Sequence, residues 1–184
     1  MRSRPASRRA AAAAHAALGA WLLVGEMAVG QLPRTSDDGG FPPGEPVAQP
    51  VVFSHKTHTA RGVKCAVCHA LRDPGKAAGF PTEALCMSCH ETVKPESAAI
   101  RRVAEHARSG QAIAWTRVYK LPDYVWFSHR VHHEQSSIAC DTCHGAVAAR
   151  DVLAREKSIS MQSCMACHAR SGASNACGFC HNPN

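Results

Sequence analysis

The residues of this 184-residue chain that could bind a metal or react with a cofactor are its ten cysteines and twelve histidines. All ten cysteines fall in five copies of one pattern, in which two cysteines separated by two residues are followed at once by a histidine. Two thiols on one helical turn can each add to a vinyl group of the same porphyrin, and the adjacent histidine can then ligate its iron. The pattern is therefore that of covalent c-type haem attachment. The copies, called sites 1 to 5, are Cys65, Cys68 and His69; Cys86, Cys89 and His90; Cys140, Cys143 and His144; Cys164, Cys167 and His168; and Cys177, Cys180 and His181.

Disulfide bonds and zinc sites are the alternative uses of ten cysteines. Both explain cysteines that occur in pairs, but neither requires a histidine directly after every pair. The separations between successive pairs are also irregular, whereas an array of zinc sites is expected to repeat regularly. The sequence therefore predicts five covalently attached haems c, with the motif histidines as proximal iron ligands.

The sixth position of each iron decides what a haem can do, because a filled position favours electron transfer and an open one allows substrate binding. His55 and His58 precede site 1, and His129 and His132 precede site 3 with the same spacing. On a helical turn, residues three positions apart lie near each other and can point to nearby but different irons. These four histidines are predicted to be distal ligands.

The sequence leaves the fifth distal ligand open. Residues 97–109 are predicted to form a helix that stops at Gly110, and His106 lies at the edge of its apolar stripe. His106 is the predicted ligand, because it could reach an iron from that edge. The alternatives are His133, Met161 and an iron without a sixth ligand.

A short segment with the pattern Phe-Ser-His-x-x-His occurs twice, and each copy is followed by two attachment motifs. Such self-similarity indicates an internal repeat. The predicted divisions are a two-haem unit at 51–91, a spacer at 92–126, and a second two-haem unit with the fifth haem at 127–184, which together make a pentahaem domain at 51–184.

The spacer ends in an aromatic segment. It holds Trp115, Tyr119, Tyr124 and Trp126 and runs into Phe127. Part of its alternation suits a short strand. Packing of these rings over haem edges is the expected role, and an electron relay is the alternative.

The first thirty residues have the order of a secretory signal. An arginine-rich start is followed by an apolar stretch and by the small residues Ala28, Val29 and Gly30, which suit cleavage. An uncleaved anchor is the alternative, although His15 and Glu26 interrupt the apolar stretch. The signal at 1–30 predicts a periplasmic protein, and peripheral membrane association is compatible with it. Residues 31–50 are rich in Pro, Gly and Asp and are predicted to be a flexible lead-in.

The formal charge of +7 does not indicate a nucleic-acid-binding protein. Residues 1–30 hold four of the 21 basic residues and one of the 14 acidic ones, so 17 against 13 remain. The remaining basic residues form no cluster with interleaved aromatics, which excludes nucleic acid as a partner.

The composition predicts a fold organised around haem. Aromatic residues make up only 5% of the chain, and much of its 45% hydrophobic content is alanine. An ordinary core of this size requires more large side chains, so porphyrin faces are expected to replace them. The expected fold is mostly α with extensive loops and little regular β structure. No uncharged apolar run of eighteen residues occurs after residue 30, which excludes a multi-span membrane protein.

The segment from Phe53 to His69 resembles the class III multihaem cytochromes of the c3/c7 type. The segment from Trp115 to Gly145 is similar to the pentahaem cytochrome subunit of alternative complex III, a membrane quinol:electron-acceptor oxidoreductase. The resemblance implies small periplasmic proteins with bis-histidine haems. It also implies His55, His58, His129 and His132 as the distal ligands.

The expected function is electron transfer in an anaerobic or aerobic respiratory chain by an exported pentahaem cytochrome. The expected partners are redox proteins or a membrane quinol-oxidising complex, of which this chain would be a non-catalytic subunit. The alternative is a multihaem reductase in which one open iron acts on a small nitrogen or sulfur oxyanion.

Overall fold

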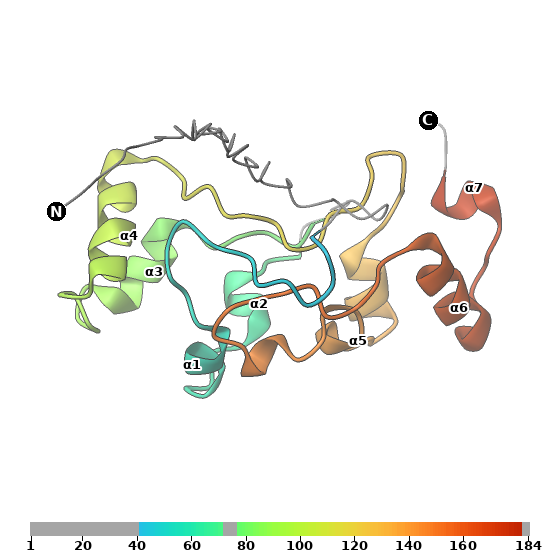
Figure 1. Cartoon of the computed structure of the whole chain (residues 1–184), viewed down its shortest axis with the longest axis horizontal. Helices are drawn as coiled ribbons and strands as arrows, with labels where there is room; N and C mark the ends of the chain where they lie inside the picture. Colours follow the sequence, from blue (N-terminus) through green and yellow to red (C-terminus); the bar gives the residue numbers. More distant parts are fainter. Residues whose placement is uncertain (1–40, 72–76, 182–184) are drawn as a thin grey trace, which may run out of the picture. The chain divides into compact units, whose positions relative to one another are not determined.

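The structure is a computed structural model that describes residues 41–71 and 77–181. All of these residues belong to one compact unit (Figure 1). The predicted signal at 1–30 and the first half of the predicted lead-in lie outside the described residues.

Short helices joined by long loops form the described chain (Figure 1). Strand pairing in the described residues is limited to two isolated bridges, Pro43 with Arg155 and Pro46 with Ala154. None of the described helices is long and apolar enough to cross a membrane. The elements are α1 (His55–Thr59), α2 (Cys65–Cys68), α3 (Glu83–His90), α4 (Ala98–Ser109), the π-helix η1 (Val131–Gln135), α5 (Cys140–His144), the 3₁₀-helix η2 (Val147–Ala149), α6 (Met161–Ser171) and α7 (Cys177–Cys180).

This architecture confirms the predicted fold class, which is mostly α with extensive loops. The short strand suggested by the aromatic alternation does not form, because residues 115–127 have no paired strand partner. The extended backbone of this segment instead carries rings and hydrogen-bonding groups to the haem sites described below.

Local sequence explains where the longer helices begin and end. The side chains of Thr82 and Ser160 accept backbone N–H groups at the starts of α3 and α6, which satisfies donors that have no partner inside a helix. Helices α4 and α6 end at Gly110 and Gly172, both in the left-handed conformation that glycine adopts without strain. The helix predicted at 97–109 is confirmed as α4.

The side-chain core is small. Val51, Val103 and Ile113 form a buried cluster, and Met87 and Trp115 pack against it. The cluster lies where α3 packs against α4. No side chain in the described ranges is both large and fully buried. The protein chain alone therefore supplies little of the interior that a domain of this size needs.

The segment before α1 is fixed to the second half of the chain. The Gly44 N–H donates to the Arg155 carbonyl at 3.0 Å, and the Val47 N–H donates to the Leu153 carbonyl at 2.8 Å. Val47 is only 2% exposed. Residues 41–50, which the composition predicts to be part of a flexible lead-in, thus pair with 153–155.

Tyr119 connects the spacer to site 3. Its hydroxyl accepts the backbone N–H of Glu156 at 3.0 Å and donates to the His144 carbonyl at 3.2 Å. Its ring lies edge-on to the His144 ring, with centroids 4.7 Å apart. Tyr119 thereby holds the end of the site 3 motif against the following loop.

Gly145, directly after His144, is a position that only glycine fits. Its φ of 75° and ψ of −162° lie in a region that is essentially restricted to glycine. A Cβ there would also lie 2.6 Å from the Cβ of Glu156. Glu156 cannot move away without loss, because its carboxylate accepts the Ala146 N–H and pairs with Arg150.

We expect Gly145→Ala to lower the free energy of unfolding by at least about 1–3 kcal/mol, because it combines backbone strain with a clash. Guanidinium unfolding of the holoprotein, followed by far-UV circular dichroism, measures the change. Gly172→Ala is the matched control, since φ there is 70° and no atom lies within 4 Å of the added Cβ. Equal effects of the two substitutions would contradict the role given to Glu156.

Candidate haem sites

The five attachment motifs all place their two cysteines on one helical turn, on α2, α3, α5, α6 and α7. None of the ten cysteines forms a disulfide, and each is exposed or half-buried. Among the described residues, no three Cys, His, Asp or Glu side chains cluster as a metal-ion site. The cysteine pairs therefore do not converge into four-ligand zinc sites, and their thiols remain available to a porphyrin edge.

Several motif thiols are held in the protonated form. Burial and the neighbouring Cys65 raise the pKa of both Cys68 and Cys140. Burial also raises the pKa of Cys143 and Cys164, and each of these thiols has a thiol of another motif among the further causes. Motif thiols thus lie close to thiols of other motifs as well as to their own partners.

The histidine rings of four sites face a second histidine ring at an almost constant distance. The ring centroids of these pairs are 6.0 to 6.2 Å apart. The second ring is in every case one of the four predicted distal ligands. The pairs and the angles between their ring planes are His55 with His69 (8°), His58 with His90 (63°), His129 with His144 (7°) and His132 with His168 (29°).

This spacing fits one iron between each pair of rings. An imidazole nitrogen lies about 2.0 Å from a metal ion and about 1.1 Å from its ring centre, so two axial imidazoles have centroids about 6.2 Å apart. The spacing of the rings at sites 1 to 4 therefore fits an iron with two histidine ligands.

Backbone hydrogen bonds fix the protonation of most of these rings. A carbonyl oxygen only accepts, so an imidazole Nδ1 beside one must carry the proton, which leaves Nε2 as the metal ligand. The distances from Nδ1 to the carbonyl oxygen are 2.8 Å for His58 to Ser54, His69 to Gly79, His90 to Val93 and His132 to Ser128, and 2.7 Å for His168 to Ser174.

The repeated Phe-Ser-His-x-x-His segment has the same local geometry in both copies. In the first, the Phe53 ring lies 4.8 Å from the His55 ring and 4.4 Å from the His58 ring. In the second, the Phe127 ring lies 4.8 Å from the His129 ring and 4.5 Å from the His132 ring. The phenylalanine therefore packs against both distal histidines and holds them apart.

The serine of each copy orients the helical turn and the second histidine. Ser54 caps α1 by accepting the Thr57 N–H at 2.9 Å, and Ser128 accepts the Val131 N–H at 3.3 Å. The carbonyls of the same two serines hold Nδ1 of the second histidine, as given above. The motif thus has a physical reason for each of its four fixed positions.

Partial burial keeps two of the predicted ligand rings neutral, as metal ligation requires. Burial, and after it the neighbouring His69 and His58, lower the pKa of His55 to about 4. Burial, followed by His129 and His69, also lowers the pKa of His144. Both rings are therefore uncharged at neutral pH and can bind iron without losing a proton.

Site 5 has different surroundings. The His181 ring lies 5.8 Å from the Tyr124 ring, and its Nδ1 is 3.4 Å from the Tyr124 carbonyl. The Trp126 N–H donates to the Cys180 carbonyl at 2.7 Å. Among the described residues, no ring contact pairs His181 with a second histidine. The aromatic segment thus fixes α7 and its motif from one side.

The candidates for the fifth distal ligand lie in different places. His106 is on α4, and its Nδ1 is 2.9 Å from the Gln111 carbonyl. Nδ1 of His133 is 2.9 Å from the Ile138 carbonyl. Both rings thus have the same protonation as the paired ligands, but no ring contact within the described ranges joins either to a motif histidine. Met161 is exposed at the start of α6. Ligation by His106 therefore stays a prediction.

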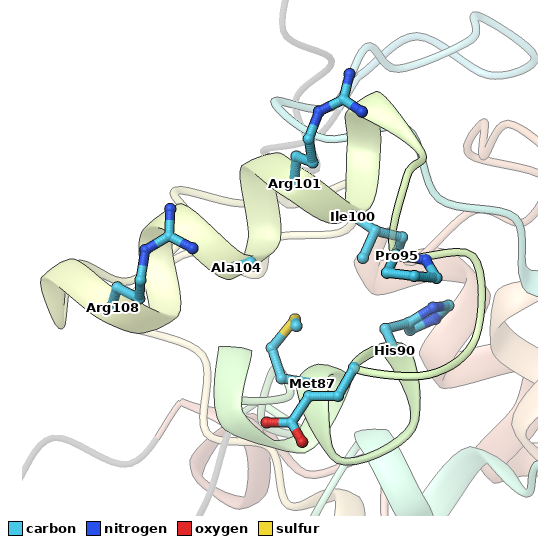
Figure 2. A pocket seen from close by; sticks show the side chains of 8 residues that line it. Met87, His90, Pro95, Ile100, Arg101, Ala104 and Arg108 are labelled. Carbon is cyan, nitrogen blue, oxygen red and sulfur yellow. The ribbon is translucent and has the colours of Figure 1, made fainter.

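Two further features suit the carboxylates of haem. A pocket of about 370 Å³ lies between α3 and α4, with Met87 and His90 on one side and Arg101 and Arg108 on the other (Figure 2). Guanidinium groups bind carboxylates well. The buried Trp115 Nε1 has no hydrogen-bond partner within the described chain, and a haem carboxylate would accept from it. Trp115 thus offers the donor that best suits a haem carboxylate, whereas the Arg101 guanidinium is already paired with Glu96.

Comparison of the sequence with known proteins also identifies a cytochrome c family. The sequence matches the family of cytochrome c7 and related cytochromes c twice, at residues 51–109 and 125–182. The chain belongs to this family. It is also 36% identical, over 162 residues, to the menaquinone reductase multihaem cytochrome c subunit of Nitratidesulfovibrio vulgaris strain Hildenborough. The match covers 72% of this chain and 76% of that subunit.

Sequence reasoning missed several residues that support these sites. Nothing in the local pattern predicts the contacts of Tyr119 with His144 and Glu156, because they join segments far apart in the chain. The clash that reserves position 145 for glycine has the same long-range origin. The only sequence signal for this close contact was Gly145 itself, because a glycine directly after a motif histidine permits an unusual backbone conformation.

We expect His58→Ala to convert one haem per chain to a high-spin form, because the substitution removes one of two axial ligands. Low-temperature EPR and the visible spectrum of the oxidised holoprotein measure the change. Lys56→Ala on the same helix is the control, since it removes only an exposed ion pair with Asp151. A high-spin signal equal to that of the control protein would show that His58 is not an iron ligand.

Proposed function

We propose that this chain is an exported pentahaem cytochrome c that carries electrons for a quinone-linked respiratory complex. The observation that supports this function best is the set of four histidine pairs at iron-ligand spacing. Irons with two histidine ligands have no position for a substrate, so such haems exchange electrons and do not transform small molecules. Electron transfer is also the role of the cytochrome c7 family to which the chain belongs.

The residues of the chain have three tasks in this function. The motif cysteines would attach each porphyrin, and the histidine pairs would hold its iron, which supplies the one-electron chemistry. Phe53, Phe127 and the backbone carbonyls hold the ligand rings in place before the iron arrives, which lowers the cost of ordering them. The phenylalanine rings and backbone carbonyls would keep the histidine rings in place whichever oxidation state the iron has, so little of the chain would have to move when an electron passes.

We infer five haems per chain, since the five motifs use all ten cysteines. The haem faces would fill the interior that the small cluster around Val103 leaves open, and their burial would supply much of the stability. The signal at 1–30 supports a periplasmic location. The pairing of histidines at sites 1 to 4 supports a non-catalytic role, because catalysis would need an open iron with acid–base groups beside it.

The proposed partner is a membrane complex that exchanges electrons with menaquinone. The relative described above is a cytochrome subunit of a menaquinone reductase. The alignment covers 76% of that subunit, which supports a role of the same kind for this chain. The expected state is therefore a subunit attached to a membrane complex rather than a free carrier.

Purification of the full chain through a C-terminal tag, from membranes of its own host, tests this function. We expect other subunits to co-purify, five haems per chain by pyridine haemochrome, and haem reduction when a menaquinol analogue is added to the complex. The isolated chain should accept electrons from dithionite but not from the menaquinol analogue, because the proposal places the quinone site on another subunit of the complex.

Two results would contradict the proposal. Purification of the chain alone from the periplasmic fraction, without membrane subunits, would exclude the complex. Steady turnover of nitrite or sulfite by the isolated chain would instead support the reductase alternative, with an open iron at site 5.

A further inference from the structure

We propose that Asp151 is a positioning residue for the haem ligands on α1, which it holds through a hydrogen bond from the Ser54 hydroxyl. Asp151 lies in the second half of the chain, 97 positions away from Ser54. The proposal deepens the electron transfer proposed above, because it rests on His58 and His90 as the two ligands of one iron at site 2. It does not depend on the number of haems or on the partner.

The hydrogen bond between Ser54 and Asp151 is charge-assisted and short. The Ser54 hydroxyl lies 2.6 Å from Oδ1 of Asp151 and 3.0 Å from Oγ1 of Thr57. A hydroxyl has one proton to donate, and the carboxylate is both the closer and the stronger acceptor, so the proton points to Asp151. This bond is the largest cause that lowers the pKa of the Asp151 carboxyl, which is therefore charged at neutral pH. The Ser54 oxygen meanwhile accepts the Thr57 N–H at 2.9 Å and so caps α1.

Ser54 passes this restraint on to the ring of His58. Its carbonyl oxygen lies 2.8 Å from Nδ1 of His58, whose ring is stacked on the Phe53 ring. Because the hydroxyl and the carbonyl belong to one residue, a shift of Ser54 moves both the helix cap and the partner of Nδ1. Partners of this kind fix the ring plane of a metal-ligating histidine. Asp151 therefore acts on a ligand of site 2 through one intermediate residue.

The chain beside Asp151 is itself bound to α1, which gives the carboxylate a fixed position. The Lys56 N–H donates to the Arg150 carbonyl at 3.0 Å, and the Thr59 hydroxyl donates to the Ala148 carbonyl at 2.8 Å. Helix α1 packs against η2 at the same place. A carboxylate on a segment held in this way can orient a serine side chain rather than follow it.

The ion pair of Asp151 with Lys56 is the less important contact. The Lys56 Nζ lies 3.6 Å from Oδ2 of Asp151, and both side chains are 62% exposed. Ion pairs that are exposed to this degree contribute little. Removal of the Lys56 side chain should therefore leave the ligand of site 2 in place, and the hydrogen bond to Ser54 does the positioning.

The second copy of the motif indicates why the first one needs this support. Ser128, the counterpart of Ser54, is only 9% exposed, so the surrounding chain encloses it. Ser54 is half-buried, and α1 has only five residues, too few for a helix to be stable without outside contacts. A carboxylate from the other half of the chain thus does for Ser54 what burial does for Ser128.

EPR of the oxidised holoprotein tests this role, because the angle between the two axial ring planes determines the g values of a low-spin ferric haem. The planes cross at 63° at site 2, compared with 8°, 7° and 29° at sites 1, 3 and 4, so the site 2 signal can be recognised. We expect Asp151→Ala to shift this signal, with the intensity of one haem per chain, and to leave the signals of sites 3 and 4 unchanged. Asp151→Asn should retain the wild-type signal, because it keeps an acceptor oxygen for Ser54.

Glu134→Gln is the matched control, since it removes an exposed carboxylate that pairs with Arg130 beside the second copy of the motif. An unchanged site 2 signal in Asp151→Ala would overturn the proposal and leave the proposed function intact. Equal shifts in Asp151→Asn and Asp151→Ala, or a site 2 shift in Glu134→Gln, would overturn it as well. A high-spin site 2 in the unmodified protein would instead contradict the ligation by His58 on which both proposals rest.

A double-mutant cycle separates action through Ser54 from a general loss of structure. In a Ser54→Ala background, Asp151→Ala should change the site 2 signal no further, and an additional change would overturn the proposal. Should an alanine variant fail to mature, NMR of the reduced, unmodified holoprotein gives a second test. The Ser54 hydroxyl proton should exchange with water slowly enough to be observed, because a carboxylate holds it, and rapid exchange would overturn the proposal.

Discussion

The fixed separation of two imidazole rings is the constraint on which the rest of this structure depends. An iron atom accepts axial nitrogens at one distance only, so the two rings of each pair must be held apart before they can be bridged. The protein does this with very short helices, whose caps, carbonyls and phenylalanine rings set the position of each histidine. Because every pair needs its own supports, much of the chain serves ligand geometry rather than a side-chain core.

Because so much of the chain positions histidine rings, few side chains remain to form a buried core in a domain of this length. The buried apolar cluster around Val103 joins α3 to α4, but elsewhere the loops pass from one site to the next. In such a protein the cofactors provide the common interior, as the metal does in small metal-dependent domains. Assembly is then expected to be coupled to haem attachment, and the order in which haems are attached can influence which long-range contacts form first.

Local pattern was sufficient to predict the helix that became α4, and it singled out the four histidines whose rings face motif histidines. Each of these depends on residues within a few positions of one another. Which distal histidine faces which motif was beyond sequence reasoning, since His58 and His132 pair with rings more than thirty residues away. The same holds for the spacer, where alternation suggested a strand, although Tyr119 uses its hydroxyl to join loops and no neighbouring strand is present in the described chain. Long-range contacts of single side chains leave no periodic signal in a sequence.

The two copies of the Phe-Ser-His-x-x-His segment differ in backbone but agree in geometry. The first forms an ordinary α-helical turn, whereas the second runs into the wider π-helix η1. Both nevertheless place their rings and their serine carbonyl at nearly the same distances. The six residues of this segment therefore set the positions of two histidine rings by local contacts, largely independent of the backbone conformation that follows. Gene duplication can lengthen a molecular conductor of this kind by adding such segments, and each addition extends the reach of the protein without redesign of the part that already works.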